Sequence, residues 1–108
     1  MPTYNKLVRD RIPEIIRNTG VDFNTRIMKE KEYHVELRKK LKEELNEYLE
    51  ANNDNSSIEE LADIVEIINA LTSVHNSSVE ELESVRKEKA EKRGGFQERI
   101  FLIDVEDE

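Results

Sequence analysis

The sequence predicts an all-α protein, an antiparallel bundle of four to five helices in a single domain covering residues 1–108. Two observations predict this class. Apolar residues recur at helical spacing through two long stretches, residues 30–51 and 58–75. Polar turns separate these stretches from each other and from a charged segment that stops at Gly94-Gly95. The chain length is close to the most common domain size, so one hydrophobic core is expected.

The first part of the chain predicts one short helix between extended segments. Residues 1–8 are expected to form an extended arm. Asp10 can cap a helix that tolerates Pro13 in its first turn and ends at Gly20. Residues 22–28 alternate weakly between apolar and polar side chains, as a short strand would.

The later elements follow in the same way. Residues 52–57 are the expected turn between the two long helices, and Ser78 with Glu81 matches a capping box at the start of the charged helix. The end of the chain alternates again and is rich in β-forming residues. Segments 22–28 and 97–105 are therefore candidates for a small two-stranded β-ribbon, which would need helices packed against it for stability.

Composition limits the function classes. Seventeen basic and 25 acidic residues give a net charge of -8, which makes nucleic acid an unlikely partner. The absence of cysteine excludes disulfides, zinc–thiolate sites and thiol nucleophiles. No apolar run approaches the roughly 18 residues of a membrane span, and the polar N-terminus is unlike a signal peptide. We expect a cytoplasmic protein with no membrane partner.

Carboxylates on the two long helices form the candidate functional site. At about 100° per residue, Glu44 lies about 50° from the centre of its helix's apolar arc and Glu47 lies at the edge, about 110° away. Glu43 points to the opposite face. On the next helix, Glu60 falls inside the apolar arc and Asp63 at its border. Each helix thus offers one carboxylate within its packing face and a second one turn further on.

Such carboxylates predict a cation site. A carboxylate on a buried face is unfavourable unless it is neutralised, and several together raise one another's pKa. A hard divalent cation removes the conflict, and an all-oxygen ligand set suits Mg²⁺, with Mn²⁺ as an alternative. Mg²⁺ commonly binds a few carboxylates together with substrate phosphates, which indicates phosphate chemistry.

Structural interpretations compete with the metal site. A Glu-x-x-Glu pair arises often by chance on a charged helix. Ser57 with Glu60 also matches a capping box, which would make Glu60 a helix-start residue. Ser56 with Glu59 offers the same cap one residue earlier and leaves Glu60 free.

A di-iron bundle is the competing helical carboxylate site, but that class uses Glu-x-x-His motifs, which are missing here. Both histidines, His34 and His75, are therefore expected to be ordinary, partly buried residues rather than ligands.

Basic residues near both ends of the chain are candidates for contacts with substrate phosphates. The expected substrate-binding residues are Lys6, Arg9, Lys89, Lys92 and Arg93. Arg93 is the strongest candidate because its planar guanidinium matches phosphate oxygens. The alternative is purely structural, since basic residues in the last turn of a helix also interact favourably with its dipole.

These motifs resemble a known family. EELNE followed by ELAD is similar to the E-x-x-E…E-x-x-D signature of the MazG-like all-α nucleotide pyrophosphohydrolases. YNKLVRDRIPEII and KAEKRGGF resemble a phosphoribosyl-ATP pyrophosphohydrolase-like branch of that superfamily, and the resemblance spans nearly the whole chain. It implies an oligomeric helical core and Mg²⁺-dependent cleavage of a nucleoside triphosphate between its α and β phosphates. The catalytic metal ligands it implies are Glu44, Glu47, Glu60 and Asp63.

The leading hypothesis is therefore a nucleotide pyrophosphohydrolase, releasing nucleoside monophosphate and pyrophosphate. Its role would be house-cleaning of non-standard nucleotides or the hydrolysis of a phosphoribosyl-ATP-like substrate. One carboxylate, Glu47 at the border of the packing face, is the candidate general base. The broad apolar arc of residues 58–75 predicts a homodimer or homotetramer. The alternative is a non-catalytic helical protein-interaction module whose carboxylates form solvated faces.

Overall fold

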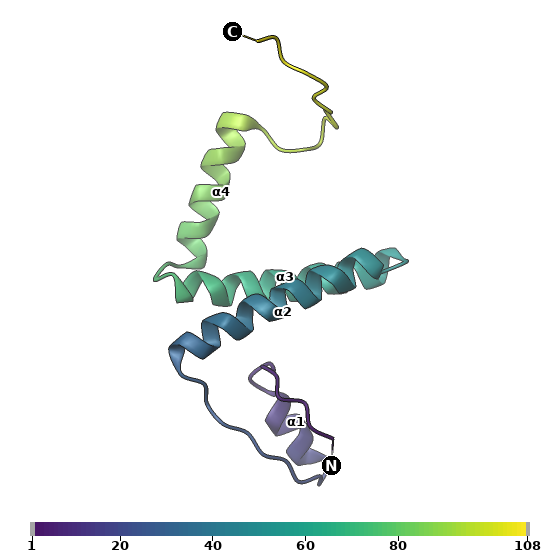
Figure 1. Cartoon of the computed structure of the whole chain (residues 1–108), viewed down its shortest axis with the longest axis vertical. Helices are drawn as coiled ribbons and strands as arrows, with labels where there is room; N and C mark the ends of the chain where they lie inside the picture. The colour runs from purple at the N-terminus through teal and green to yellow at the C-terminus, as the bar shows by residue number, and fades with distance from the viewer. Residues whose placement is uncertain (1, 108) are drawn as a thin grey trace.

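The computed structural model describes residues 2–107 and confirms the all-helical class: these residues form four helices and no strand. The helices are α1 (Ile12–Asn18), α2 (Glu30–Glu50), α3 (Asp54–Val74) and α4 (Val79–Arg93). Helices α2 and α3 form a closely packed pair at the centre of the molecule, α1 lies to one side of them, and α4 projects to the other (Figure 1). No helix within residues 2–107 combines the length and hydropathy needed to cross a lipid bilayer.

The core lies between α2 and α3. Its buried apolar side chains are Leu37, Ile64 and Ile67. In an antiparallel helical hairpin, residues equally far from the turn lie opposite each other, and Leu37 and Ile67 are both fifteen positions from Asn52. The apolar periodicity of the two helices thus leads directly to their packing.

The turn between α2 and α3 is shorter than the sequence predicts. Helix α3 begins at Asp54, within the expected 52–57 turn, because the Asn53 side chain accepts a hydrogen bond of 2.8 Å from the Ser56 amide. Ser57 lies inside the helix, where its hydroxyl donates to the Asn53 carbonyl at 2.8 Å. The capping-box interpretation of Ser57 and Glu60 is therefore wrong, and Glu60 is free to face α2.

The sequence also predicts N-terminal caps for α1 and α4, and the structure tests both. The Asp10 cap is wrong: α1 has Arg11 at its N-cap with no side-chain hydrogen bond, and the Ile12 amide bonds the Arg9 carbonyl at 3.1 Å instead. A backbone turn has replaced the side-chain cap.

The N-cap half of the capping box of α4 is confirmed, with the Glu81 amide donating to the Ser78 hydroxyl at 3.1 Å, while the Glu81 carboxylate accepts from the Ser77 hydroxyl at 2.8 Å. Gly94 ends that helix with a φ of 80°, in the left-handed region that glycine adopts without strain.

The molecule is elongated. Its radius of gyration is 18.8 Å, against about 13 Å expected for a compact domain of this length. Segments 22–28 and 97–105 form no strand and lie near opposite ends of the long axis (Figure 1). The β-ribbon predicted within one chain is therefore wrong, because α4 carries the C-terminal segment away from the N-terminal one.

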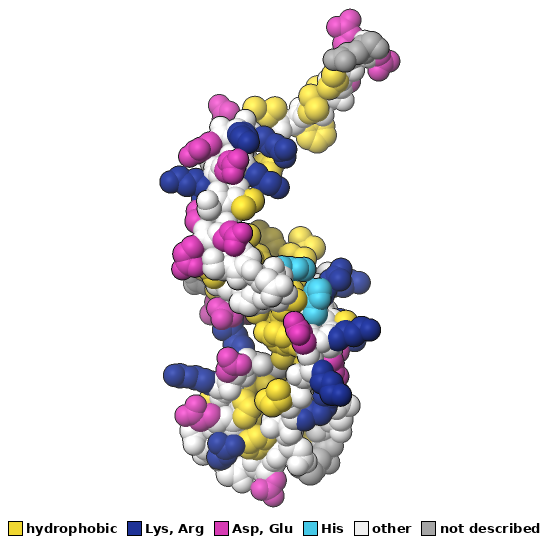
Figure 2. Space-filling view, turned by 90° about the vertical axis from the view of Figure 1, so that its left-hand side faces the viewer, with side chains coloured by type: hydrophobic (Ala, Val, Ile, Leu, Met, Phe, Trp, Pro, Cys, Tyr) yellow, Lys and Arg dark blue, Asp and Glu magenta, His cyan; other side chains and the backbone are white. Residues whose placement is uncertain are grey.

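Much of the apolar surface is exposed. On α3, Ile58, Leu61 and Val65 are exposed, and on α4, Val79, Leu82 and Val85 are exposed as well. Figure 2 shows hydrophobic side chains at the surface from the helical body up to the C-terminal segment. One copy of the chain therefore leaves much of the apolar surface of α3 and α4 uncovered.

Candidate metal centre

The α2–α3 hairpin brings three of the four predicted ligands together. Carboxylate oxygens of Glu44, Glu47 and Glu60 all lie within 4.8 Å of one another. Glu44 and Glu60 are each eight positions from Asn52, so the same hairpin register that pairs Leu37 with Ile67 places them face to face. Glu47 stands one helical turn from Glu44 and joins them from the exposed border of α2.

Burial divides the cluster as the angular positions predict. Glu44 and Glu60 are partly buried, whereas Glu47 is exposed. Glu43, which the helical projection places on the opposite face, is exposed and outside the cluster. Within the described residues, the Oε2 atoms of Glu44 and Glu60 are buried without a hydrogen-bond partner. Each therefore has an acceptor that water does not reach and that no donor satisfies.

The electrostatics of the cluster favour an added positive charge. Burial raises the pKa of Glu44 to about 7, and its contacts with Glu47 and Glu60 and the charges of Glu47 and Asp63 act in the same direction. The pKa of Glu60 is also raised, first by burial and then by Glu47 and Asp63. A proton or a cation can relieve this repulsion.

Asp63, the fourth predicted ligand, is not in the cluster. It accepts a hydrogen bond of 2.5 Å from a guanidinium nitrogen of Arg9, an ion pair whose two side chains are 39% and 56% exposed. The sequence predicted separate roles for these residues, as metal ligand and phosphate contact. In the structure they neutralise each other beside the three glutamates.

The remaining predicted phosphate contacts do not reach the carboxylates. Lys6 lies over the ring of Tyr4, 5.6 Å from its centre. Lys89, Lys92 and Arg93 belong to α4, which leaves α3 at the end opposite the α2–α3 turn (Figure 1). Lys92 pairs with Glu88 at 3.1 Å. Within residues 2–107, Arg9 is thus the only one of the five that contacts a predicted ligand.

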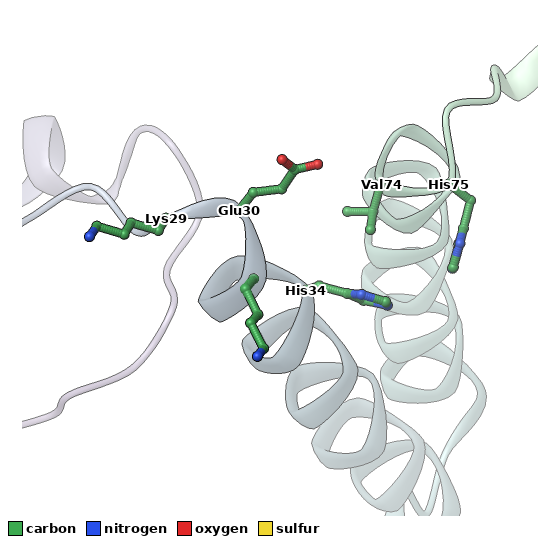
Figure 3. Close-up of a pocket in the computed structure, with 6 residues that line it drawn as sticks. Lys29, Glu30, His34, Val74 and His75 are labelled. Atoms are coloured by element: carbon green, nitrogen blue, oxygen red, sulfur yellow. The ribbon is translucent and has the colours of Figure 1, made fainter.

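A second polar site, not predicted from the sequence, lies at the opposite end of the hairpin. His34 and His75 pack edge to face with ring centres 5.3 Å apart, beside an open depression of about 470 Å³ (Figure 3). Lys29, Glu30 and Val74 also line it. His34 is partly buried as expected, but His75 is exposed because α3 ends there. Helical periodicity gave no signal for this contact, which depends on how α3 terminates.

No family model matches this chain, and neither a curated protein nor a solved structure shows significant similarity to it. The arrangement of the carboxylates is therefore the basis for a functional assignment.

Proposed function

We propose that this chain is a Mg²⁺-dependent nucleoside triphosphate pyrophosphohydrolase of the MazG-like type. The observation that carries the proposal is the convergence of Glu44, Glu47 and Glu60 from two helices, with two buried carboxylate oxygens lacking a partner. Carboxylate clusters on a solvated surface need no cation, whereas acceptors removed from water need a donor, a proton or a cation as a partner.

The donor set fits a hard cation. All three side chains offer oxygen, and one of them is exposed, which leaves an approach for a substrate's phosphates. Glu44, Glu47 and Glu60 would hold the ion, with Asp63 beside them. When bound, Mg²⁺ would supply Lewis-acid polarisation of a phosphate and lower the pKa of water. Mn²⁺ offers the same coordination.

The protein's own groups would handle the proton and the leaving group. In the proposed reaction, a water oxygen bonds to the α-phosphorus, and the bond from that phosphorus to the bridging oxygen breaks. Glu47, the exposed carboxylate, accepts the water's proton. Pyrophosphate leaves with the bonding electron pair, and Arg9 exchanges Asp63 for its phosphate oxygens. Lys6, Lys89, Lys92 and Arg93 are further candidates for neutralising the polyphosphate.

We further propose that the functional unit is a cytoplasmic homodimer or homotetramer. Exposed apolar residues on α3, among them Ile58 at 65% and Val65 at 54%, are the support. Sedimentation should show an oligomer at micromolar concentration. A stable monomer under those conditions would contradict this part of the proposal.

The catalytic part is tested by a screen of nucleoside triphosphates with Mg²⁺ for pyrophosphate release. Glu44→Gln and Glu60→Gln should each lower the rate roughly 100-fold or more, as the loss of a metal ligand typically does. Glu59→Gln is the matched control, because Glu59 is the exposed neighbour of Glu60. If the native chain releases no pyrophosphate and neither Mg²⁺ nor Mn²⁺ raises its melting temperature, the interaction-module hypothesis replaces the enzyme.

A further inference from the structure

Two segments of the chain are suited to pairing but have no partner within it. The arm segment is residues 21–28, and the tail segment is residues 100–105. Within the described part of the chain, neither makes a backbone–backbone hydrogen bond. Each is an open run of peptide donors and acceptors, which readily accepts a second strand.

Both segments carry exposed apolar side chains, although four of the eight residues of the arm segment are polar and its Phe23 and Met28 are partly buried. In the arm segment, Ile27 is 95% exposed and Val21 is 60% exposed. In the tail segment, all five apolar residues are between 72% and 87% exposed: Ile100, Phe101, Leu102, Ile103 and Val105. Five apolar side chains exposed to water within six residues are unfavourable, because each gains free energy when its apolar surface is removed from water. Both segments therefore gain by being covered.

The shape of the molecule determines whether the same chain or a second copy can cover these two segments. The arm segment and the tail segment lie near opposite ends of a molecule 64 Å long (Figure 1). They do not meet within one chain. A two-fold axis perpendicular to the long axis would place the tail of each copy beside the arm of the other, and the contact would occur twice.

Charge also favours a second copy. Residues 1–31 contain seven basic and four acidic residues, a net charge of +3. Residues 96–108 contain one basic and five acidic residues, a net charge of -4. The two ends of the chain attract each other, whereas head-to-head or tail-to-tail association would bring like charges together.

We propose that two copies of this chain exchange their ends, with the tail segment of each pairing as a β-strand with the arm segment of the other. Alternate side chains of a strand point to the same face, so the odd-numbered residues of each segment lie together on one face. Phe101, Ile103 and Val105 share one face of the tail strand, and Val21, Phe23 and Ile27 share one face of the arm strand. A two-stranded ribbon is marginal alone, so its apolar face would rest on the exposed surface of the helices. The inference does not depend on the nucleotide chemistry.

Cysteine cross-linking of the full-length chain tests the exchange, because the native sequence has no cysteine. Chains carrying Ile27→Cys are mixed with chains carrying Phe101→Cys, Ile103→Cys or Val105→Cys and oxidised. We expect a mixed disulfide dimer at least tenfold above the control, Ile27→Cys mixed with Glu91→Cys on exposed α4. Leu102→Cys and Asp104→Cys should give less than their neighbours, as strand parity requires. Yields no greater than the control at every tail position would overturn the proposal.

A double variant separates exchange from folding back within one chain. Ile27→Cys/Ile103→Cys should form covalent dimers, whereas an internal disulfide in a monomer would overturn the proposal.

Hydrogen exchange of the unsubstituted protein gives an independent readout. Amides of both segments should become at least tenfold more protected between nanomolar and micromolar protein, and protection that is absent or independent of concentration would also overturn it. Pyrophosphate release can be measured on the same samples, so a failed exchange and a failed enzyme assignment are distinguishable.

Discussion

The two ends of the α2–α3 hairpin carry different functional groups, carboxylates near the turn and imidazoles at the far end. Near the turn, Glu44 and Glu60 place carboxylate oxygens out of reach of water, and the pKa of Glu44 rises to about 7. At the far end, His34 and His75 contact each other by their ring edges beside an open depression. Both pairs bridge the same two helices. Among these four side chains, only the two carboxylates include buried polar atoms without a hydrogen-bond partner, so the carboxylate end is the one that we propose binds a cation.

Divalent-cation binding should show the largest difference between the two ends. Saturating Mg²⁺, at about 100 times its Kd, should stabilise the native chain by about 2.7 kcal/mol. Glu60→Gln should remove nearly all of this gain because it deletes one anionic ligand and leaves the buried position polar. The measurement is the melting temperature with and without Mg²⁺.

His34→Gln is the matched change at the other end of the hairpin and should keep the full Mg²⁺ response. An equal loss in both variants would mean that Mg²⁺ acts on the whole hairpin, and the contrast between its ends would be lost.

Stability of the metal-free protein should fall as pH rises. The pKa of Glu44 is about 7 in the folded chain, above the ordinary value of 4.5. The folded state therefore binds more protons than the unfolded state between these values, so this contribution is present below pH 4.5 and lost as pH rises through 7. Because the side chain is only partly buried, we expect a loss on the order of 1–2 kcal/mol.

Chemical unfolding between pH 4.5 and 8 in the presence of a chelator measures this slope. Glu44→Gln should flatten it, whereas Glu43→Gln, on the exposed side of the same helix, should not. Added Mg²⁺ should also reverse the trend, since deprotonated carboxylates bind it best. A slope that survives in Glu44→Gln would assign the pH dependence to other groups.

The sequence was sufficient where local spacing determines structure. Periodicity places Leu37, Glu44 and Glu60 on the facing sides of two helices, but the hairpin register came from the structure, because α3 begins at Asp54, inside the expected 52–57 turn. It was not sufficient where a long-range contact competes with a local role. Asp63 matches the ligand spacing, but its partner, Arg9, comes from a segment 54 residues earlier. The prediction of a β-ribbon within one chain is wrong for the same reason. Local β propensity does not reveal that α4 separates segment 97–105 from segment 22–28.

Breaking the Arg9–Asp63 ion pair should have the smallest effect on stability, but it distinguishes a role of Arg9 in metal binding from a role in phosphate binding. Both side chains are substantially exposed, so Arg9→Gln should change the free energy of unfolding by less than about 1 kcal/mol. Its effects on binding and turnover should have opposite signs. Removing a cation beside the cluster should tighten Mg²⁺ binding, by roughly twofold to fivefold for a change of that size. Removing the group proposed to receive the leaving phosphates should lower kcat by about tenfold or more.

Calorimetry with Mg²⁺ and steady-state kinetics separate these two effects. Arg11→Gln, a neighbouring exposed arginine, should leave both unchanged. If Arg9→Gln instead weakens Mg²⁺ binding, Arg9 positions Asp63 for the metal and does not serve the phosphates. Asp63 would then act with the three glutamates at the turn end of the hairpin despite lying outside their cluster. Arg9, from the N-terminal segment, would then be a positioning residue for the carboxylate end of the hairpin, and among residues 2–107 the histidine end has no such residue in this comparison.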